Sequence, residues 1–151
     1  GFAVAVMQRA LLRASEEDKS LAVLMVDLDH FKRINDAHGH ARGDIVLQET
    51  TRAIQSTLRS DDMVGRFGGE EFVVLLPGAD LDQAMGAAER CRAAVESMEI
   101  PGAPYLSITA SVGVAAFPDH GADLDVLLKA SDRAMYKAKA DGRNRVASAR
   151  G

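Results

Sequence analysis

The stretch SLAVLMVDLD, residues 20–29, decides how this chain folds. It contains six consecutive apolar residues, a run that is too short for most helices. A continuous apolar run of this length, without polar alternation, is typical of a strand that is buried on both faces. We therefore predict that residues 20–29 form the central strand of a sheet with helices packed on it.

Amphipathic segments surround this strand. Apolar residues recur every three to four positions, the spacing of a helix with one buried face, in residues 2–15, 43–60, 81–97 and 123–142. The shared faces include Val4, Met7 and Leu11 in the first helix and Leu47, Ile54 and Leu58 in the second. A shorter helical turn is expected at residues 30–39. Asp44 is the candidate N-cap of the second long helix, and Gly142 stops the last one at a C′-like position.

Three further segments complete the sheet. Residues 62–77 predict a hairpin whose Gly-Gly link suits a tight primed turn with positive φ. The β-branched residues of 106–117 predict a strand in which Gly113 marks a bulge or a close approach, and residues 143–149 add a short edge strand. The order α-β-α-α-β-β-α-β-α-β favours an α+β domain with a mixed, largely antiparallel five-stranded sheet.

The composition fits a single domain over residues 1–151. The chain is long enough for a hydrophobic core, 47% of it is hydrophobic, and its formal net charge is −4, so broad binding to nucleic acid is not favoured. Cys91 is the single cysteine, which excludes an internal disulfide and fits a reducing compartment. No apolar run approaches the length of a membrane span, and the N-terminus lacks a signal-peptide pattern. We expect a cytoplasmic domain without membrane contact of its own, and a membrane anchor elsewhere in a longer protein stays open.

Two pairs of carboxylates stand at the ends of apolar strands. Asp27 and Asp29 end the central strand on one face, and Glu70 and Glu71 follow the glycines of the hairpin. Asp29 has a structural explanation as the cap of the helix that starts near Phe31. Asp27 has none, and a carboxylate at the end of a buried strand needs a partner, a metal ion or water. If the hairpin lies beside the central strand, Asp27 and Glu70 converge into an oxygen site for Mg²⁺ or Mn²⁺ and a phosphate-bearing substrate.

Candidate groups for a nucleotide lie elsewhere in the chain. Neither a P-loop nor a G-x-G-x-x-G motif after a strand occurs. Lys32 lies in the first turn of the short helix, whose free N–H groups can bind an anion. Lys139 and Arg143 would share a face if the last helix continued, which suits phosphate binding but also a solvated basic helix end. Asn35 and Asp44 together could bind the edge of guanine, although each alone also suits a turn or a cap.

These motifs together resemble the GGDEF family of diguanylate cyclases. Four blocks in the family's order and spacing cover almost the whole chain: VDLDHFKRINDAHGHARGD at 26–44, RSDDMVGRFGGEEF at 59–72, SITASVGVA at 107–115 and ASDRAMYKAKADGRNRV at 130–146. The resemblance implies a central sheet surrounded by helices, similar to the polymerase palm and to class III nucleotide cyclases. It also implies that two GTP molecules are condensed into cyclic di-GMP with release of two pyrophosphates.

By position in these motifs, the resemblance implies a role for each candidate residue. Two Mg²⁺ or Mn²⁺ ions per site would be held by Asp27, the carbonyl of Leu28, Glu70 and Glu71. Asp27, Glu70 and Glu71 would be catalytic, with Glu70 the favoured general base. GTP would be bound by the backbone at His30, Phe31, Gly68 and Gly69, by the side chains of Lys32, Lys139 and Arg143, and at guanine by Asn35 and Asp44. Each domain would hold one GTP, so catalysis would require a homodimer.

A second implied site is inhibitory. Arg59 and Asp62 form an R-x-x-D motif five residues before the GGEEF motif, where product-inhibited members of the family carry it, and Arg90 stands where the family often supplies another arginine. The resemblance therefore implies allosteric binding of cyclic di-GMP at Arg59, Asp62 and Arg90. The block D-x-L-T-G-L-x-N-R-R that usually opens the family is absent from this chain, so we expect a fragment of a longer protein with an upstream sensory or regulatory domain.

Three alternatives share the same fold. A catalytically inactive domain could act as a receptor that binds cyclic di-GMP at Arg59 and Asp62. A cyclase with relaxed base choice could make a mixed guanine–adenine dinucleotide, although Asp44 favours guanine. A scaffold domain would leave the carboxylates of Asp27 and Glu70 unexplained.

Overall fold

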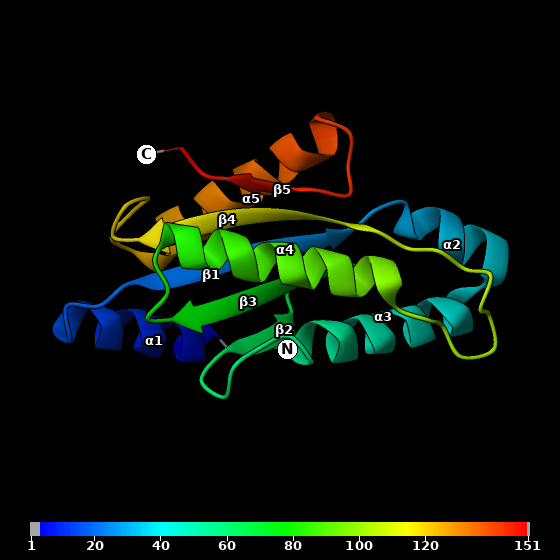
Figure 1. Ribbon diagram of the computed structural model, residues 1–151, viewed down its shortest axis with the longest axis horizontal. Helices are drawn as coiled ribbons and strands as arrows, with labels where there is room; N and C mark the ends of the chain where they lie inside the picture. The colour runs from blue at the N-terminus through cyan, green and yellow to red at the C-terminus, as the bar shows by residue number, and fades with distance from the viewer. Residues whose placement is uncertain (1–3, 151) are drawn as a thin grey trace.

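The computed structural model describes residues 4–150, which form a five-stranded sheet with helices on both faces (Figure 1). The strands are β1 (Leu21–Leu28), β2 (Met63–Arg66), β3 (Glu71–Pro77), β4 (Ala110–Phe117) and β5 (Val146–Ser148). The helices are α1 (Val4–Glu16), α2 (Phe31–His38), α3 (His40–Gln55), α4 (Leu81–Ser97) and α5 (Leu124–Ala140). This succession of elements confirms the predicted α+β domain, and Phe2 and Ala3 of the predicted first helix lie outside the described residues.

Strand β1 is the centre of the sheet, whose order is β2-β3-β1-β4-β5. It pairs antiparallel with β3 on one side and with β4 on the other, while β5 runs parallel to β4 at the edge. All eight residues of β1 are buried. The predicted central strand, the mixed and largely antiparallel sheet and the short edge strand are therefore confirmed.

The alternation of side chains along β1 divides the core into two layers. Ala22, Leu24 and Val26 pack in one cluster with apolar residues of α2, α3 and α4. Leu21 and Val23 pack in a second cluster with residues of α1 and α5. In Figure 1, α4 accordingly crosses in front of the strands and α5 lies behind them. Because helices cover both faces, the apolar run has no position at which a polar side chain could reach water.

Gly113 of β4 lies directly against α5. A Cβ atom at this position would collide with the backbone carbonyl of Ser131 and the backbone nitrogen of Met135. The register between β1 and β4 runs without interruption through Gly113, so the strand has no bulge there. Of the two predicted explanations, the close approach of another element is correct, because the absent side chain lets α5 sit on the sheet.

The second long helix begins earlier than predicted. Gly39, with a φ of +84°, lies between α2 and α3 and occupies the N-cap position of α3. Since α3 starts at His40, Asp44 lies inside the helix, and its predicted capping role is wrong. The reason is that the chain turns at Gly39, where positive φ costs little, while Gly43 is incorporated into the helix.

The hairpin link is longer than predicted. Four residues, 67–70, connect β2 to β3, and the Phe67 N–H donates to the Glu71 carbonyl at 2.8 Å. Neither Gly68 nor Gly69 has a positive φ. The predicted two-residue primed turn is therefore wrong, and Glu70 belongs to the loop rather than to a strand.

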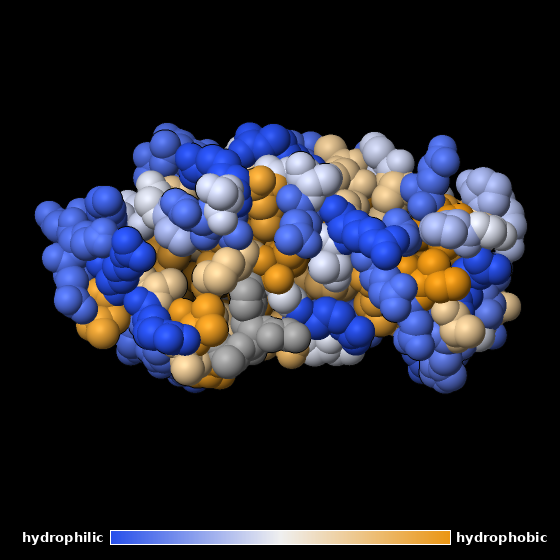
Figure 2. Space-filling model, turned by 90° about the horizontal axis from the view of Figure 1, so that it is seen from below, coloured by the Kyte–Doolittle hydropathy of each residue, from blue (hydrophilic) through white to orange (hydrophobic). Residues whose placement is uncertain are grey.

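Smaller differences concern the ends of elements and the surface. Met7 and Leu11 are buried as predicted, whereas Val4, at the start of α1, is 59% exposed. Leu58 packs against the core from beyond the end of α3, and β4 begins four residues later than predicted. Figure 2 shows hydrophobic residues in several separate patches among hydrophilic ones on the face seen from below. No helix within residues 4–150 is long and apolar enough to cross a membrane.

We expect Gly113→Ala to lower the free energy of unfolding by about 1–3 kcal/mol, because the added methyl group would force α5 away from β4. The measurement is urea denaturation followed by circular dichroism. Gly86→Ala in α4 is the matched control, since a Cβ there would meet only an Arg90 nitrogen at 3.6 Å, and we expect it to stabilise by about 0.5–1 kcal/mol. Equal stability of Gly113→Ala and the unmodified chain would contradict the close packing described here.

Candidate active site

The carboxylates of β1 and of the hairpin meet at one end of the sheet. The antiparallel register places Asp27 opposite Glu71 of β3 and opposite Ser111 of β4. At the next position, the Leu28 N–H donates to the Glu70 carbonyl at 3.3 Å. Asp27, Leu28, Glu70 and Glu71 are therefore neighbours in space, although Leu28 and Glu70 are 42 positions apart in the chain. Directly paired residues point to the same face, so Asp27 and Glu71 both belong to the side of the sheet that α5 covers.

Asp27 is a buried carboxylate that the chain satisfies only in part. It is 5% exposed, and its Oδ2 atom forms an ion pair with the Lys139 ammonium of α5 at 2.9 Å. Its other oxygen, Oδ1, is buried and has no hydrogen-bond partner. Because an unpaired buried oxygen is unfavourable, this atom is the part of the site that is best suited to accept a ligand.

The electrostatics of this cluster disfavour further negative charge. Burial raises the pKa of Asp27, the contact with Lys139 lowers it, and the neighbouring Glu70 raises it again. Burial also raises the pKa of Glu71, and the charges of Asp27 and Glu70 add to that effect. Lys139 lowers the pKa of both groups, but the charges of Glu70, Asp29 and Asp132 oppose it, so an added cation would relieve the remaining repulsion.

The donor atoms fit a hard divalent cation. Carboxylate and carbonyl oxygens suit Mg²⁺ or Mn²⁺, and the unpartnered Oδ1 of Asp27 offers one ligand position. Within residues 4–150, no three side chains of His, Cys, Asp or Glu already stand together as a metal cluster. A cation at this site would therefore be bound by few protein oxygens and would complete its shell with water and substrate phosphates, as Mg²⁺ usually does.

Asp29 does not cap α2. Its carboxylate is 4% exposed and accepts hydrogen bonds from the hydroxyls of Thr109 and Ser111, both at 2.7 Å, and from the Asn144 N–H at 3.0 Å. The N-cap position of α2 is His30, which has a φ of +58° and makes no side-chain capping bond. The predicted cap is wrong because residues from the β4 side and from the turn after α5 already satisfy the Asp29 carboxylate.

The candidate phosphate ligands come from two elements. His30, Phe31 and Lys32 lie at the start of α2, directly after β1, and the side chain of Lys32 is exposed. Lys139 lies in the last turn of α5, where it contacts Asp27. Arg143 lies beyond the end of that helix with a φ of +63°. Because α5 ends one residue after Lys139, the condition for a shared helix face of Lys139 and Arg143 is not met.

The candidate guanine ligands lie where α2 and α3 pack together. The Oδ1 atom of Asn35 is buried, has no hydrogen-bond partner and lies where a Cβ on Gly43 would be. Gly43 thus makes room for the amide group of Asn35. Asp44, the next residue along α3, is exposed. Asn35 thus has a buried amide oxygen without a partner, and Asp44 has an exposed side chain.

The hairpin loop is held by an arginine that sequence analysis missed. The Arg66 guanidinium donates to the Gly69 carbonyl at 2.7 Å. A Cβ on Gly68 would lie 3.0 Å from a carboxylate oxygen of Glu71, whereas a Cβ on Gly69 would meet nothing within 4 Å. Gly68 therefore accommodates Glu71, and Gly69 leaves an open backbone surface. The available signal for Arg66 was its place at the end of β2, three residues before the loop carbonyl that it contacts.

Two hydroxyl groups were also missed. Thr109 and Ser111 are two residues apart on one face of a mostly apolar segment, and both donate to Asp29. Ser111 is fully buried, so its hydroxyl needs a partner. Polar residues at alternate positions of an otherwise apolar strand were a usable signal for a buried polar contact.

The predicted inhibitory residues line a separate cavity of about 280 Å³ between the end of β3 and α4. The Arg59 N–H donates to the Asp62 carboxylate at 2.9 Å, and the Arg59 guanidinium lies 3.8 Å from the same oxygen. Arg90 of α4 lines the same cavity. Because Leu76 and Ala79 also line it, this cavity lies at the end of β3 that is opposite Glu71.

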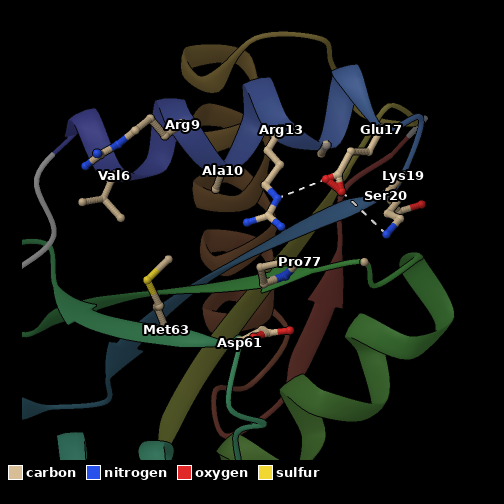
Figure 3. Close-up of a pocket in the computed structure, with 12 residues that line it drawn as sticks. Val6, Arg9, Ala10, Arg13, Glu17, Lys19, Ser20, Asp61, Met63 and Pro77 are labelled. Carbon is tan, nitrogen blue, oxygen red and sulfur yellow. Dashed lines mark hydrogen bonds and ion pairs between the residues drawn. The ribbon is translucent and has the colours of Figure 1, made fainter.

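A larger cavity of about 430 Å³ lies between α1 and the edge formed by β2 and the end of β3 (Figure 3). Arg13 of α1 points into it and forms an ion pair with Glu17 at 3.0 Å, and Lys19 contacts the same carboxylate at 3.7 Å. None of the residues predicted for catalysis, GTP binding or inhibition lines this cavity. Cavity size therefore does not identify the candidate site, whereas the unpartnered carboxylate oxygen of Asp27 does.

Comparison with known sequences agrees with the family resemblance of the motifs. The family model described as "Diguanylate cyclase, GGDEF domain" matches residues 4–145. Diguanylate cyclase DgcM of Escherichia coli (strain K12) is 46% identical over 136 residues, which cover 90% of this chain and 32% of that protein. Diguanylate cyclase A of Treponema denticola is 40% identical over 134 residues, which cover 88% of this chain and 36% of that protein. The chain thus spans about a third of the length of these curated relatives.

Solved structures share the fold over nearly the whole chain. The GGDEF domain of PA1120 (YfiN or TpbB) from Pseudomonas aeruginosa has a TM-score of 0.90 at 38% identity, covering 95% of this chain and 91% of that one. The active GGEEF domain of a diguanylate cyclase from Vibrio cholerae has a TM-score of 0.88 at 34% identity, covering 97% and 94%. The GGDEF domain of DgcB from Caulobacter crescentus, in complex with c-di-GMP, has a TM-score of 0.85 at 29% identity, covering 95% and 86%.

We expect Glu71→Gln to raise the melting temperature of the ligand-free chain by about 1–3 °C at pH 8 but not near pH 4. Burial and the charges of Asp27, Asp132 and Glu70 raise the pKa of Glu71 in the folded chain. The contribution of Glu71 to stability is therefore present at low pH, where its side chain is protonated. It is lost as the pH rises through the folded-state pKa. Removing the charge should therefore help only where Glu71 is ionised. The measurement is thermal unfolding in a chelating buffer, with exposed Glu99→Gln as control. A lower melting temperature of Glu71→Gln at pH 8 would show that its charge is stabilising.

Proposed function

Because the chain belongs to the GGDEF family of diguanylate cyclase domains, we propose that it condenses two molecules of GTP into cyclic di-GMP and releases two pyrophosphates. The observation that carries this proposal is the buried, unpartnered oxygen of Asp27, which lies beside Glu70 and Glu71 at the end of the central strand. A purely structural carboxylate would be satisfied within the chain, as that of Asp29 is. The GGEEF form of the motif is also that of the Vibrio cholerae domain that is described as active.

The carboxylates and one carbonyl are the proposed cation ligands. Asp27, the Leu28 carbonyl, Glu70 and Glu71 would hold Mg²⁺ or Mn²⁺, with two ions per site as the family resemblance implies. When bound, these ions neutralise phosphate charge, lower the pKa of the attacking 3′-hydroxyl and polarise the α-phosphate. Lys139 balances the charge of Asp27 in the ligand-free chain. When a bound cation balances that charge instead, the Lys139 ammonium becomes available to a phosphate.

The remaining candidates bind and orient GTP. Lys32 and Arg143 would join Lys139 at the triphosphate, and the backbone N–H groups at the start of α2, around His30 and Phe31, would add hydrogen bonds. The open backbone surface at Gly69, together with Gly68, lets the nucleotide approach the hairpin loop. Asn35 and Asp44 would bind guanine, because a carboxylate accepts from its N1–H and its amino group and the amide can bond to its remaining polar edge.

The reaction needs two domains. The 3′-oxygen of one GTP forms a bond to the α-phosphorus of the other, the bond from that phosphorus to the bridging oxygen of the β-phosphate breaks, and pyrophosphate leaves. Glu70 is the proposed base that takes the proton of the 3′-hydroxyl. Since each domain holds one GTP, a homodimer with facing sites would carry out the reaction twice to close the ring.

We further propose that cyclic di-GMP binds in the cavity of about 280 Å³ that Arg59, Asp62 and Arg90 line and thereby inhibits synthesis. Two arginines can pair with phosphates, and the carboxylate can accept from guanine. The related DgcB domain was crystallised in complex with c-di-GMP. This cavity lies at the opposite end of β3 from Glu71, so the product would act there without competing directly for the GTP site.

Asp27→Asn is expected to reduce synthesis of cyclic di-GMP by about 100-fold or more, because it removes the charge that the proposed cation needs while keeping the shape of the side chain. Product is measured by chromatography after incubation of the protein with GTP and Mg²⁺. Asp125→Asn, which breaks an exposed ion pair with Lys129, is the control and should keep full activity. Turnover retained in Asp27→Asn would contradict the assignment, and an inactive parent protein that binds cyclic di-GMP would favour a receptor instead.

Arg59→Ala is expected to leave the initial rate of synthesis unchanged and to weaken binding of cyclic di-GMP by about 10-fold or more, because one charge-assisted contact to phosphate is lost. Calorimetry with cyclic di-GMP and rate measurements at increasing product concentration test both parts. Arg52→Ala, at an exposed arginine of α3 that pairs with Glu49, is the matched control. Unchanged inhibition in Arg59→Ala would place the inhibitory site elsewhere.

A further inference from the structure

The turn after α5 has an unusual backbone. Gly142, Arg143 and Asn144 follow one another with φ values of +131°, +63° and +46°. Glycine adopts this region freely and asparagine tolerates it, but an arginine there is uncommon. Three such residues in succession need outside contacts to hold them, since the local sequence alone does not favour the conformation.

The first outside contact comes from the end of β1. The Asn144 N–H donates to the Asp29 carboxylate at 3.0 Å, and Thr109 and Ser111 hold the same carboxylate through their hydroxyls. Asp29 and Asn144 are 115 residues apart in the chain. The backbone of the turn is thus fixed relative to the strand that carries Asp27.

The second contact comes from α4. The side-chain oxygen of Asn144 accepts from the Arg92 guanidinium at 2.7 Å, and its amide nitrogen donates to the Glu96 carboxylate at 2.6 Å. Arg92 is itself held by two hydrogen bonds to Glu89, at 2.6 and 2.8 Å, and its side chain is only 15% exposed. Both ends of the Asn144 amide are therefore occupied by α4 groups that are oriented in advance.

This arrangement matters because the proposed phosphate ligands lie in the turn and at the end of the helix before it. Lys139 lies in the last turn of α5 and Arg143 lies within the turn, next to Asn144. We infer that Asn144, held by Arg92 and Glu96, is a positioning residue for Arg143, which is proposed to bind the triphosphate together with Lys139. The inference rests on the proposed function and adds to it residues that do not touch the substrate.

The core of α5 does not depend on this contact. The helix is seated on β4 at Gly113, and β5 is paired with β4 after the turn. Removing the Arg92 contact should therefore leave the sheet and its helices in place while the turn samples other conformations. Arg143 would then spend less time where a phosphate can bind it.

The test compares binding of a triphosphate and of a monophosphate. A non-hydrolysable GTP analogue with Mg²⁺ and GMP are titrated into the parent chain, into Arg92→Met and into Asn144→Gly. Asn144→Gly keeps the N–H to Asp29 and tolerates positive φ but lacks the side chain. Both variants are expected to bind the GTP analogue about 10-fold more weakly and to bind GMP unchanged, which corresponds to the loss of one oriented charge-assisted contact.

Two further measurements separate positioning from simple stabilisation. In an Arg143→Ala background, Arg92→Met should cause no additional loss of affinity for the analogue, since the residue that it positions is gone. Amide hydrogen exchange at residues 142–145 should be faster in Arg92→Met than in the parent chain. Lys137→Met, which breaks the ion pair with Asp141 at the same end of α5, is the matched control and should change neither quantity.

The outcomes distinguish the two proposals. If the parent chain does not bind the analogue more tightly than GMP, the proposed triphosphate site fails and this inference fails with it. If the parent chain has that preference and Arg92→Met and Asn144→Gly retain it, only the positioning role is overturned. If Arg92→Met does not fold, Asn144→Gly alone decides, because it leaves the α4 side chains and the backbone bond to Asp29 intact. Equal weakening of both ligands would also overturn the positioning role.

Discussion

The structure depends on a strand that is buried on both of its faces. The eight residues of β1 are at most 5% exposed, so its backbone groups must pair within the sheet and its side chains as far as Val26 must be apolar. Polar chemistry is confined to the carboxyl end of the strand, where Asp27 stands and the chain leaves the sheet. For that reason the carboxylates, the start of α2, the hairpin loop and the end of α5 gather at this one place.

Two aspartates at that end meet the same desolvation problem in different ways. The carboxylate of Asp29 accepts hydrogen bonds from two hydroxyls and a backbone N–H, so it does not need a ligand. Asp27 has one ammonium partner and one oxygen with none. The first carboxylate ties β1 to β4 and to the turn after α5, and the second remains open. Sequence analysis gave a structural role to Asp29 alone, but it named the wrong partners for the Asp29 carboxylate.

Local signals were enough to predict several elements. The bounds of α4 follow from its periodicity, and the stop of α5 follows from Gly142. The capping box of Asp80 at the start of α4 is a finding of the structure. The sequence also supported a conditional prediction, that Asp27 and Glu70 converge if the hairpin lies beside the central strand, and the structure meets that condition. These features depend on interactions within one element or on the need to cover an apolar strand.

The features that could not be predicted depend on choices that local sequence leaves open. Gly39 and Gly43 could each end a helix, and the structure turns only at Gly39, which moves Asp44 into α3. The partners of Asp29 are 80 to 115 residues away. The place of Arg143 depends on the same distant contacts, so the sequence predicted that α5 stops at Gly142 but did not predict the conformation of the turn that follows.

The central position of β1 also governs how the sheet can assemble. Leu21 pairs with Pro77 and with Phe117, which are 56 and 96 residues further along the chain, whereas β2 and β3 are close neighbours in sequence. Closing such long loops costs chain entropy, and this cost comes before the paired strands contribute stabilising contacts. The hairpin can therefore form early, but the inner strand stays incomplete until β4 has been synthesised. During translation, the strand that becomes buried along its whole length is thus the one that waits longest for its second neighbour.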